Sequence, residues 1–196
     1  IAIAPMAASA ATIMKIGFAT INDGQHKSAK WIAKEVMKRT NGSIDVKVYP
    51  AAQLGKIPRM IEGVLLGTIE GFISPPGFFK GLNPAFAAPD APGLFNSFAH
   101  QTKTMNHPSV RSKFLNLGTP KGVTGLYISA AGASALAMRD PVRKLADVKG
   151  KKIRVLASPI EVAIMRSLGA AGTPMAYSEV LPAIQRRVLD GASSAI

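Results

Sequence analysis

Short apolar runs that alternate with helical runs are the feature that most constrains the fold of this chain. Residues 13–19 predict a strand, and the helix after it has apolar positions spaced three and four apart, at Ala29, Ile32, Ala33, Val36 and Met37. Residues 44–49 alternate as a second strand, residues 57–65 predict a second helix, and residues 70–74 predict a third strand. Strands and helices that alternate at this spacing favour a parallel βαβαβ unit, and therefore an α/β fold.

The middle of the chain is less regular. Residues 75–108 are rich in Pro, Gly, Asn and Phe, and this composition predicts loops and short helices. Strands are expected around residues 123–129 and 134–138. We therefore expect a first lobe over residues 11–129 and a partial second lobe over residues 130–196.

Local signals become clearer toward the end of the chain. Residues 153–156 predict a strand, and Ser158-Pro159-Ile160-Glu161 has the pattern of a capping box with proline in the first helical position. Ser178 is expected to cap the next helix, and Asp190-Gly191 then turns into a strand-like segment. Because the sequence stops abruptly at Ile196, we expect a fragment that ends inside a sheet and leaves apolar surface uncovered.

The first fourteen residues carry no charge and contain Ala8-Ser9-Ala10, the small-x-small pattern of a signal-peptidase site. We interpret residues 1–10 as the remnant of an export signal; a hydrophobic first strand is the alternative. The apolar run stops at Lys15 and contains Pro5, so it is too short for a transmembrane helix. These features predict a periplasmic protein.

The basic composition raises the question of an anionic partner. Lys and Arg number 24 against 11 Asp and Glu, for a formal net charge of +13, which can attract nucleic acid, anionic lipid or acidic solutes. No aromatic residues interleave with the basic ones as a stacking surface would require, and the basic residues are scattered except for Lys149, Lys151, Lys152 and Arg154. We therefore expect a solvated basic surface and no nucleic-acid partner.

Enzyme chemistry finds little support in the sequence. The chain has no cysteine, which excludes a thiol nucleophile and a thiolate metal site. His26, His100 and His107 lack metal-ligand spacing and are expected on helix surfaces or in loops. The nucleophile-elbow, Walker and dinucleotide-binding glycine motifs do not occur. We predict a protein that is not an enzyme and that uses no cofactor.

Five stretches carry a family resemblance: TNGSIDVKVYPAAQLG (40–55), EGVLLGTIE (62–70), DVKGKKIRV (147–155), PMAYSEV (174–180) and VLDG (188–191). Their order and spacing resemble the solute-binding proteins of tripartite ATP-independent periplasmic (TRAP) transporters, DctP type. The resemblance implies a periplasmic-binding-protein-like architecture of two α/β lobes, of which this chain would hold the first and an incomplete second, because the family's mature chains are longer.

The resemblance also implies a function. Proteins of this type capture a small organic acid in the cleft between the lobes and deliver it to membrane permease subunits for secondary active uptake. Two alternatives stay open: the solute receptor of an ATP-driven importer, and a basic protein that binds nucleic acid or an anionic surface.

Arg154 is the strongest candidate for a ligand-binding residue. A guanidinium offers paired N–H donors that match a carboxylate, and Arg154 resembles the family's carboxylate-binding arginine in motif and position. The resemblance implies a role for Tyr177, where the family often places an aromatic residue over the ligand. It also implies one for Ser194, where many members carry asparagine.

Three further positions rest on the resemblance alone. Ser134 stands where sialic-acid-binding members carry a second arginine, and this difference disfavours a sialic-acid-like ligand. Asn22 and Phe78 match cleft segments of the family by location only. Without the second arginine, and with Phe72, Phe78, Phe79 and Tyr177 present, one hypothesis for the ligand is a monocarboxylate with an apolar or aromatic body; the alternative is that these phenylalanines belong to the core.

Overall fold

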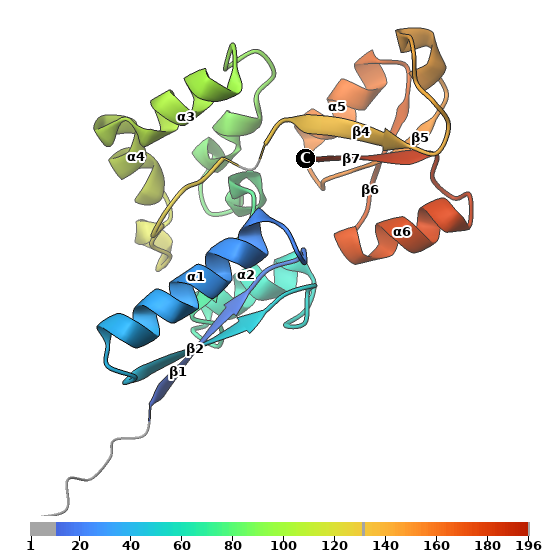
Figure 1. Cartoon of the computed structure of the whole chain (residues 1–196). Coiled ribbons are helices and arrows are strands. Elements are labelled where there is room, and N and C mark those ends of the chain that lie inside the picture. Colours follow the sequence, from blue (N-terminus) through green and yellow to red (C-terminus); the bar gives the residue numbers. More distant parts are fainter. Residues whose placement is uncertain (1–10, 131, 196) are drawn as a thin grey trace, which may run out of the picture. The chain divides into compact units, whose positions relative to one another are not determined.

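The structure, a computed structural model, describes residues 11–130 and 132–195 (Figure 1). The chain divides after Ile73 into two compact units. The export signal predicted at residues 1–10 lies outside the described residues. The division differs from the expected lobe boundary at residue 129, since the described residues after Ile73 add no strand to the first sheet. The extent of each lobe therefore stays a prediction.

The first unit contains the predicted βαβαβ arrangement. Its elements are β1 (Thr12–Gly17), α1 (Gly24–Arg39), β2 (Ile44–Tyr49), α2 (Ile57–Leu65) and β3 (Gly71–Phe72). The three strands are parallel in the order β2-β1-β3, with Thr12 beside Ile44. Of the apolar positions predicted for the first helix, Ala29, Ile32, Ala33 and Val36 pack on this sheet beside the buried residues Ile16, Phe18 and Val46. The prediction is wrong for Met37, which is exposed. This unit confirms the α/β pattern.

The second unit begins with short helices, as the composition predicted. They are η1 (Pro76–Phe79), η2 (Pro84–Asp90), α3 (Phe98–Asn106), α4 (Pro108–Leu115) and η3 (Thr119–Lys121). The strand expected over residues 123–129 is wrong, because this extended segment joins no sheet. Instead it is tied to the end of α4, where the Gly125 N–H donates to the Leu115 carbonyl at 2.8 Å. A side chain at Gly125 would meet that carbonyl, so glycine permits the close approach.

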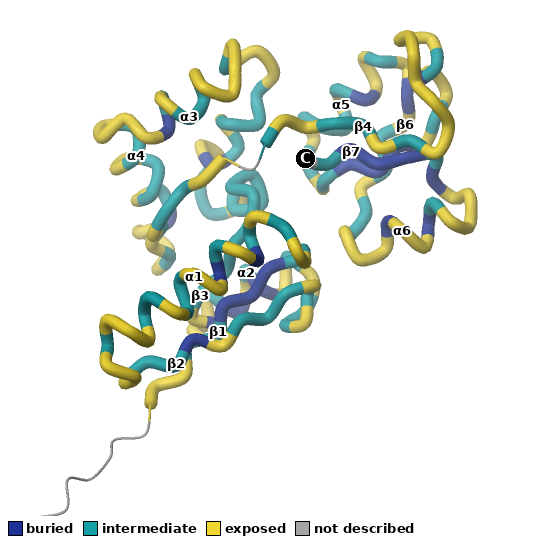
Figure 2. Tube along the Cα trace, in the orientation of Figure 1, coloured by how far each residue is buried: buried dark blue, intermediate teal, exposed yellow. Residues whose placement is uncertain are grey.

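A mixed four-stranded sheet forms the rest of the second unit. Its strands are β4 (Ser134–Met138), β5 (Lys152–Val155), β6 (Ala171–Pro174) and β7 (Gly191–Ala195), in the order β4-β7-β5-β6. The strands β7, β5 and β6 are parallel, and β4 is antiparallel to β7. The last strand is therefore an inner strand that pairs on both sides, and Figure 2 shows it mostly buried. Among the described residues near the end of the chain, Leu189 and Ala192 are buried and Val188 is exposed, so the expected apolar surface stays a prediction.

Helices α5 (Pro159–Ser167) and α6 (Tyr177–Gln185) connect these strands, with the turn η4 (Leu145–Val148) before β5. The capping box predicted at Ser158 is wrong, because its side chain makes no capping hydrogen bond, although Pro159 does take the first helical turn. The cap predicted at Ser178 is also wrong, since α6 already begins at Tyr177. None of the helices in the described ranges combines the length and the apolar character needed to cross a membrane.

Candidate functional site

Arg154 lies in the inner strand β5 with its side chain buried. Its neighbours Ile153 and Val155 are fully buried on the other face, in the hydrophobic core below α5. The Arg154 side chain is only 2% exposed. Its Nε donates to the Met175 carbonyl at 3.0 Å, and its Nη1 donates to the Ser193 carbonyl at 3.3 Å. Backbone from two other segments therefore fixes the guanidinium in place.

These contacts leave part of the guanidinium available. Of the five N–H donors of an arginine, two donate within the described residues, so three remain for a ligand. Burial lowers the pKa of Arg154 because the charged guanidinium loses hydration, while Glu161 and Tyr177 raise this pKa by electrostatic attraction. Arginine stays protonated under these conditions. A fixed, poorly hydrated cation with unused donors is suited to hold an anion.

Tyr177 and Arg154 are in contact. The Arg154 Cζ lies 5.6 Å from the centroid of the Tyr177 ring, within the range of a cation–π interaction. Tyr177 is the first residue of α6 and is 44% exposed. The ring thus reaches from the solvent to the buried cation. The structure brings these two predicted residues together.

The sheet register places the two predicted serines on opposite faces. Arg154 is paired with Ala192 of β7, and directly paired residues share a face. Ser194 follows two residues later, so it lies on the same face as Arg154. Ser134 is paired with Ala195 and therefore lies on the other face, where it is exposed. Only Ser194 shares the side of the sheet that carries the arginine.

Asn22 and Phe78 lie outside the four-stranded sheet that carries Arg154. Asn22 belongs to the first unit, in the turn after β1, where its φ is 60° and its N–H donates to His26 Nδ1 at 3.1 Å. His26 was expected at the surface but is buried, with its ring 5.5 Å from that of Phe18. Phe78 lies half-buried in η1 of the second unit. A binding role for Asn22 and Phe78 stays a prediction.

Two acidic residues of the second unit were missed by sequence reasoning. Glu161 was assigned to a helix cap, but its Oε2 accepts the Leu156 N–H at 3.0 Å, in the loop directly after β5. Asp90, at the end of η2, has a raised pKa because it is partly buried and because Glu161 repels its charge. Each of the two carboxylates stands in an otherwise apolar segment of the sequence. This pattern indicates a functional residue only when the structure also shows that the carboxylate is partly buried.

The basic residues are distributed differently from expectation. Arg154 is buried and so does not belong to a surface cluster with its lysine neighbours. The expectation that no aromatic residue interleaves with basic ones is wrong for α1, where Trp31 is 62% exposed among exposed lysines at Lys27, Lys30 and Lys34. This face of α1 therefore combines exposed basic side chains with an aromatic one, as polyanion-binding surfaces do.

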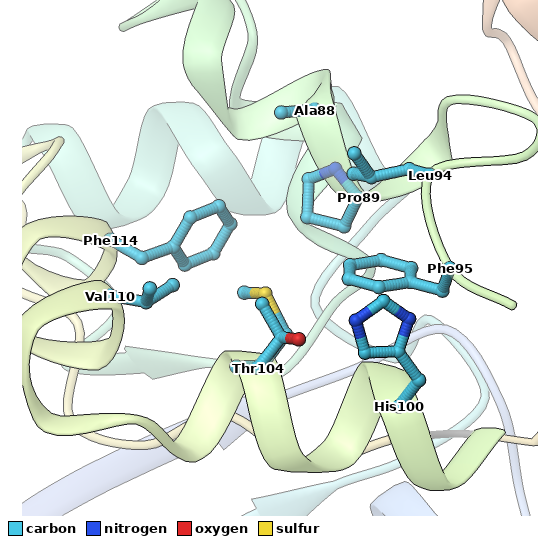
Figure 3. A pocket seen from close by; sticks show the side chains of 9 residues that line it. Ala88, Pro89, Leu94, Phe95, His100, Thr104, Val110 and Phe114 are labelled. Carbon is cyan, nitrogen blue, oxygen red and sulfur yellow. The ribbon is translucent and has the colours of Figure 1, made fainter. Parts of the chain in front are cut away.

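A separate cavity of about 220 Å³ lies between η2, α3 and α4 (Figure 3). Its walls are mainly apolar, and Figure 3 shows the Phe114 and Phe95 rings directed toward it from different sides. The polar side chains in its lining are His100 and Thr104, and His100 Nδ1 already accepts the Asn96 N–H at 3.2 Å. None of the predicted binding residues lines it. An apolar cavity without a cation is poorly suited to a carboxylate.

The sequence of the chain matches a known family over most of its length. Residues 17–196 match DctP, described as bacterial extracellular solute-binding protein, family 7. The chain is 34% identical over 183 residues to the 2,3-diketo-L-gulonate-binding periplasmic protein YiaO of Escherichia coli (strain K12), a match that covers 92% of this chain and 56% of that protein. It is 32% identical over 155 residues to the C4-dicarboxylate-binding periplasmic protein DctP of Rhodobacter capsulatus, covering 79% of this chain and 46% of that protein.

Solved structures agree with this assignment. A TRAP periplasmic solute-binding protein from Xanthobacter autotrophicus Py2 with bound β-D-galacturonate has a TM-score of 0.85 and 34% identity, covering 92% of this chain and 61% of that one. The chain therefore spans about half the length of these relatives. The sequence match and the shared fold together show that the chain belongs to the DctP family of TRAP solute-binding proteins.

Proposed function

We propose that the protein is the extracytoplasmic receptor of a TRAP transporter and that it captures a small organic acid for secondary active uptake. The observation that carries this proposal is the guanidinium of Arg154, which is buried, fixed by two backbone carbonyls, and left with unused donors. A carboxylate taken from water must regain hydrogen bonds from such a fixed donor set. Binding then requires no bond-making step and no cofactor.

The ligands of similar proteins support an anionic ligand for this protein. Similar proteins are named for binding 2,3-diketo-L-gulonate and C4-dicarboxylates, and another was solved with β-D-galacturonate. All of these ligands carry at least one carboxylate, whereas their remaining groups differ. We propose that Arg154 binds the shared carboxylate, that Tyr177 covers the pair, and that Ser194 offers a hydroxyl on the same face. Asn22 and Phe78 remain proposed contacts, and Ser134 the least supported one because of its face.

The proposed partner is the membrane permease of the same transporter, and the proposed location is the periplasm. Both follow from membership of an extracytoplasmic family whose similar members are named periplasmic proteins. The family match favours the TRAP reading over a receptor for an ATP-driven importer. It also favours a solute receptor over a general polyanion binder, which would have to use the exposed lysines beside Trp31 on α1.

A thermal-shift screen of organic acids on the full-length protein tests the proposal. A true ligand at 100 times its dissociation constant adds about 2.7 kcal/mol to the free energy of unfolding, which is a clear rise in Tm. The same ligand at the same concentration should give a much smaller rise in an Arg154→Ala variant. Heparin serves as the control for polyanion binding, which would weaken steeply with salt. A salt-sensitive response to heparin, with no response to any organic acid, would contradict the proposal.

A further inference from the structure

The carboxylate of Glu161 lies at the loop that follows the arginine strand instead of at the start of its own helix. Its Oε2 accepts the Leu156 N–H at 3.0 Å, and Leu156 stands two residues after Arg154. The predicted capping partner Ser158 takes no part in capping. Among the described residues, Oε1 of Glu161 accepts no hydrogen bond, so it remains free to accept one from a ligand.

The charge of Glu161 acts on two groups of the same unit. It attracts the Arg154 guanidinium and so raises the pKa of that group against the effect of burial. It also repels Asp90 and contributes to the raised pKa of that carboxyl, after burial as the larger cause. The surroundings of the arginine therefore contain a fixed negative charge as well as the positive one, and burial weakens the screening of both by water.

We propose that Glu161 determines which organic acids the Arg154 site accepts: it selects acids with one carboxylate and hydroxyl groups, and it rejects acids with a second carboxylate. This inference rests on the proposed function. The first carboxylate of a ligand pairs with Arg154. A hydroxyl can then donate to the free oxygen of Glu161, whereas a second carboxylate is repelled by it, because like charges close together in a poorly hydrated site are costly.

The basic side chains near the loop after β5 do not cancel the repulsion between Glu161 and a second carboxylate. Lys80 and Arg166 line an open hollow with Ala157, Ser158 and Pro159, next to the loop that Glu161 holds. Both basic side chains belong to exposed residues, so water and salt screen their attraction for a ligand. Glu161 is partly buried and is fixed by its hydrogen bond to Leu156, so its charge is screened less.

The test compares two acids that differ at one end only. D-galactonate ends in a –CH₂OH group where galactarate has a second carboxylate, and both keep the same hydroxyl groups along the chain. Calorimetric titration of the full-length protein should show tighter binding of galactonate. In Glu161→Gln, the amide oxygen can still accept the Leu156 N–H while the charge is gone, so the galactarate affinity should rise at least tenfold relative to galactonate.

Two control variants are measured beside Glu161→Gln. Glu161→Asp keeps the charge and should keep the preference for galactonate. Glu62→Gln removes an exposed carboxylate of the first unit, which pairs with Arg59 at 3.2 Å, and should change neither affinity. If Glu161→Gln does not fold, the wild-type protein still decides the question, because equal affinities for the two acids overturn the role of Glu161.

The outcomes separate this inference from the proposed function. Loss of galactonate binding in Arg154→Ala, together with an unchanged affinity ratio in the neutral variant, overturns the role of Glu161 and leaves the receptor function in place. A wild-type protein that binds galactarate as tightly as galactonate also overturns it. Full binding of both acids by Arg154→Ala contradicts the proposed function itself.

Discussion

The guanidinium of Arg154 lies over the ring of Tyr177, with Cζ 5.6 Å from the ring centroid, while the carbonyls of Met175 and Ser193 fix two of its nitrogens. The cation is therefore positioned before any ligand arrives. Because the guanidinium is already fixed in the free protein, binding costs less side-chain conformational entropy.

Replacing Tyr177 tests the value of this ring. Tyr177→Ala removes the ring that positions and covers the Arg154 guanidinium, so we expect a lower carboxylate affinity, by no more than the roughly 30-fold that corresponds to a cation–π contact of about 2 kcal/mol. Tyr177→Phe keeps an aromatic face and should retain most of the affinity. Calorimetric titration with β-D-galacturonate provides the measurement, and equal affinities for all three proteins would show that the ring has no binding role.

Neutralising Asp90 should stabilise the protein near neutral pH. Its folded-state pKa is raised, first by burial and then by repulsion from Glu161, so the folded protein holds this proton more tightly than the unfolded chain. The stability that this proton contributes is present below the ordinary pKa of 3.8 and is lost as the pH rises through the folded-state pKa. Asp90→Asn should therefore raise the free energy of unfolding at pH 7.

Urea unfolding at several pH values measures this effect. The advantage of Asp90→Asn should shrink as the pH falls toward 4. Asp45→Asn is a suitable control, because Asp45 forms a surface ion pair with Lys47 at 2.8 Å, which water and salt screen, so its loss should change the free energy of unfolding little. A less stable Asp90→Asn protein at pH 7 would mean that the carboxylate is stabilised by its surroundings.

Helix caps provide a prediction with an internal control. Asp23 Oδ1 accepts the His26 N–H at 3.0 Å at the start of α1, whereas Ser158 makes no such bond at the start of α5. Asp23→Ala should lower the free energy of unfolding by about 1 kcal/mol. Ser158→Ala should change it by less than about 0.5 kcal/mol. Urea unfolding of both variants decides the matter, and a larger loss in Ser158→Ala would restore the capping box.

The sequence predicted the local elements well because their signals are local. The alternation in residues 44–49 and the helical spacing after Gly24 each depend on neighbouring residues, and both elements are present. The strand expected at residues 123–129 failed because a strand needs a partner in space, and this segment bonds to the end of α4 instead.

The site shows the same limit. The chemistry of a guanidinium and the family resemblance identified Arg154, yet its burial depends on carbonyls 21 and 39 residues away in the sequence. The four-residue pattern at Ser158 satisfied the rule for a capping box, but Glu161 bonds to Leu156 on the other side of the turn. Tertiary contacts with alternative partners overrode the local rule.

The proposed function depends on the binding of the ligand carboxylate by Arg154. Calorimetric titration of the full-length protein with β-D-galacturonate should show a loss of about 2 to 5 kcal/mol in Arg154→Ala, which is roughly 30-fold to several thousand-fold in affinity. Arg154→Lys should restore little, because a point charge cannot reproduce two parallel hydrogen bonds. Arg166→Ala, an exposed arginine on α5, is the matched control and should bind normally. An Arg154→Ala protein that is folded by circular dichroism and loses less than threefold in affinity would contradict the account.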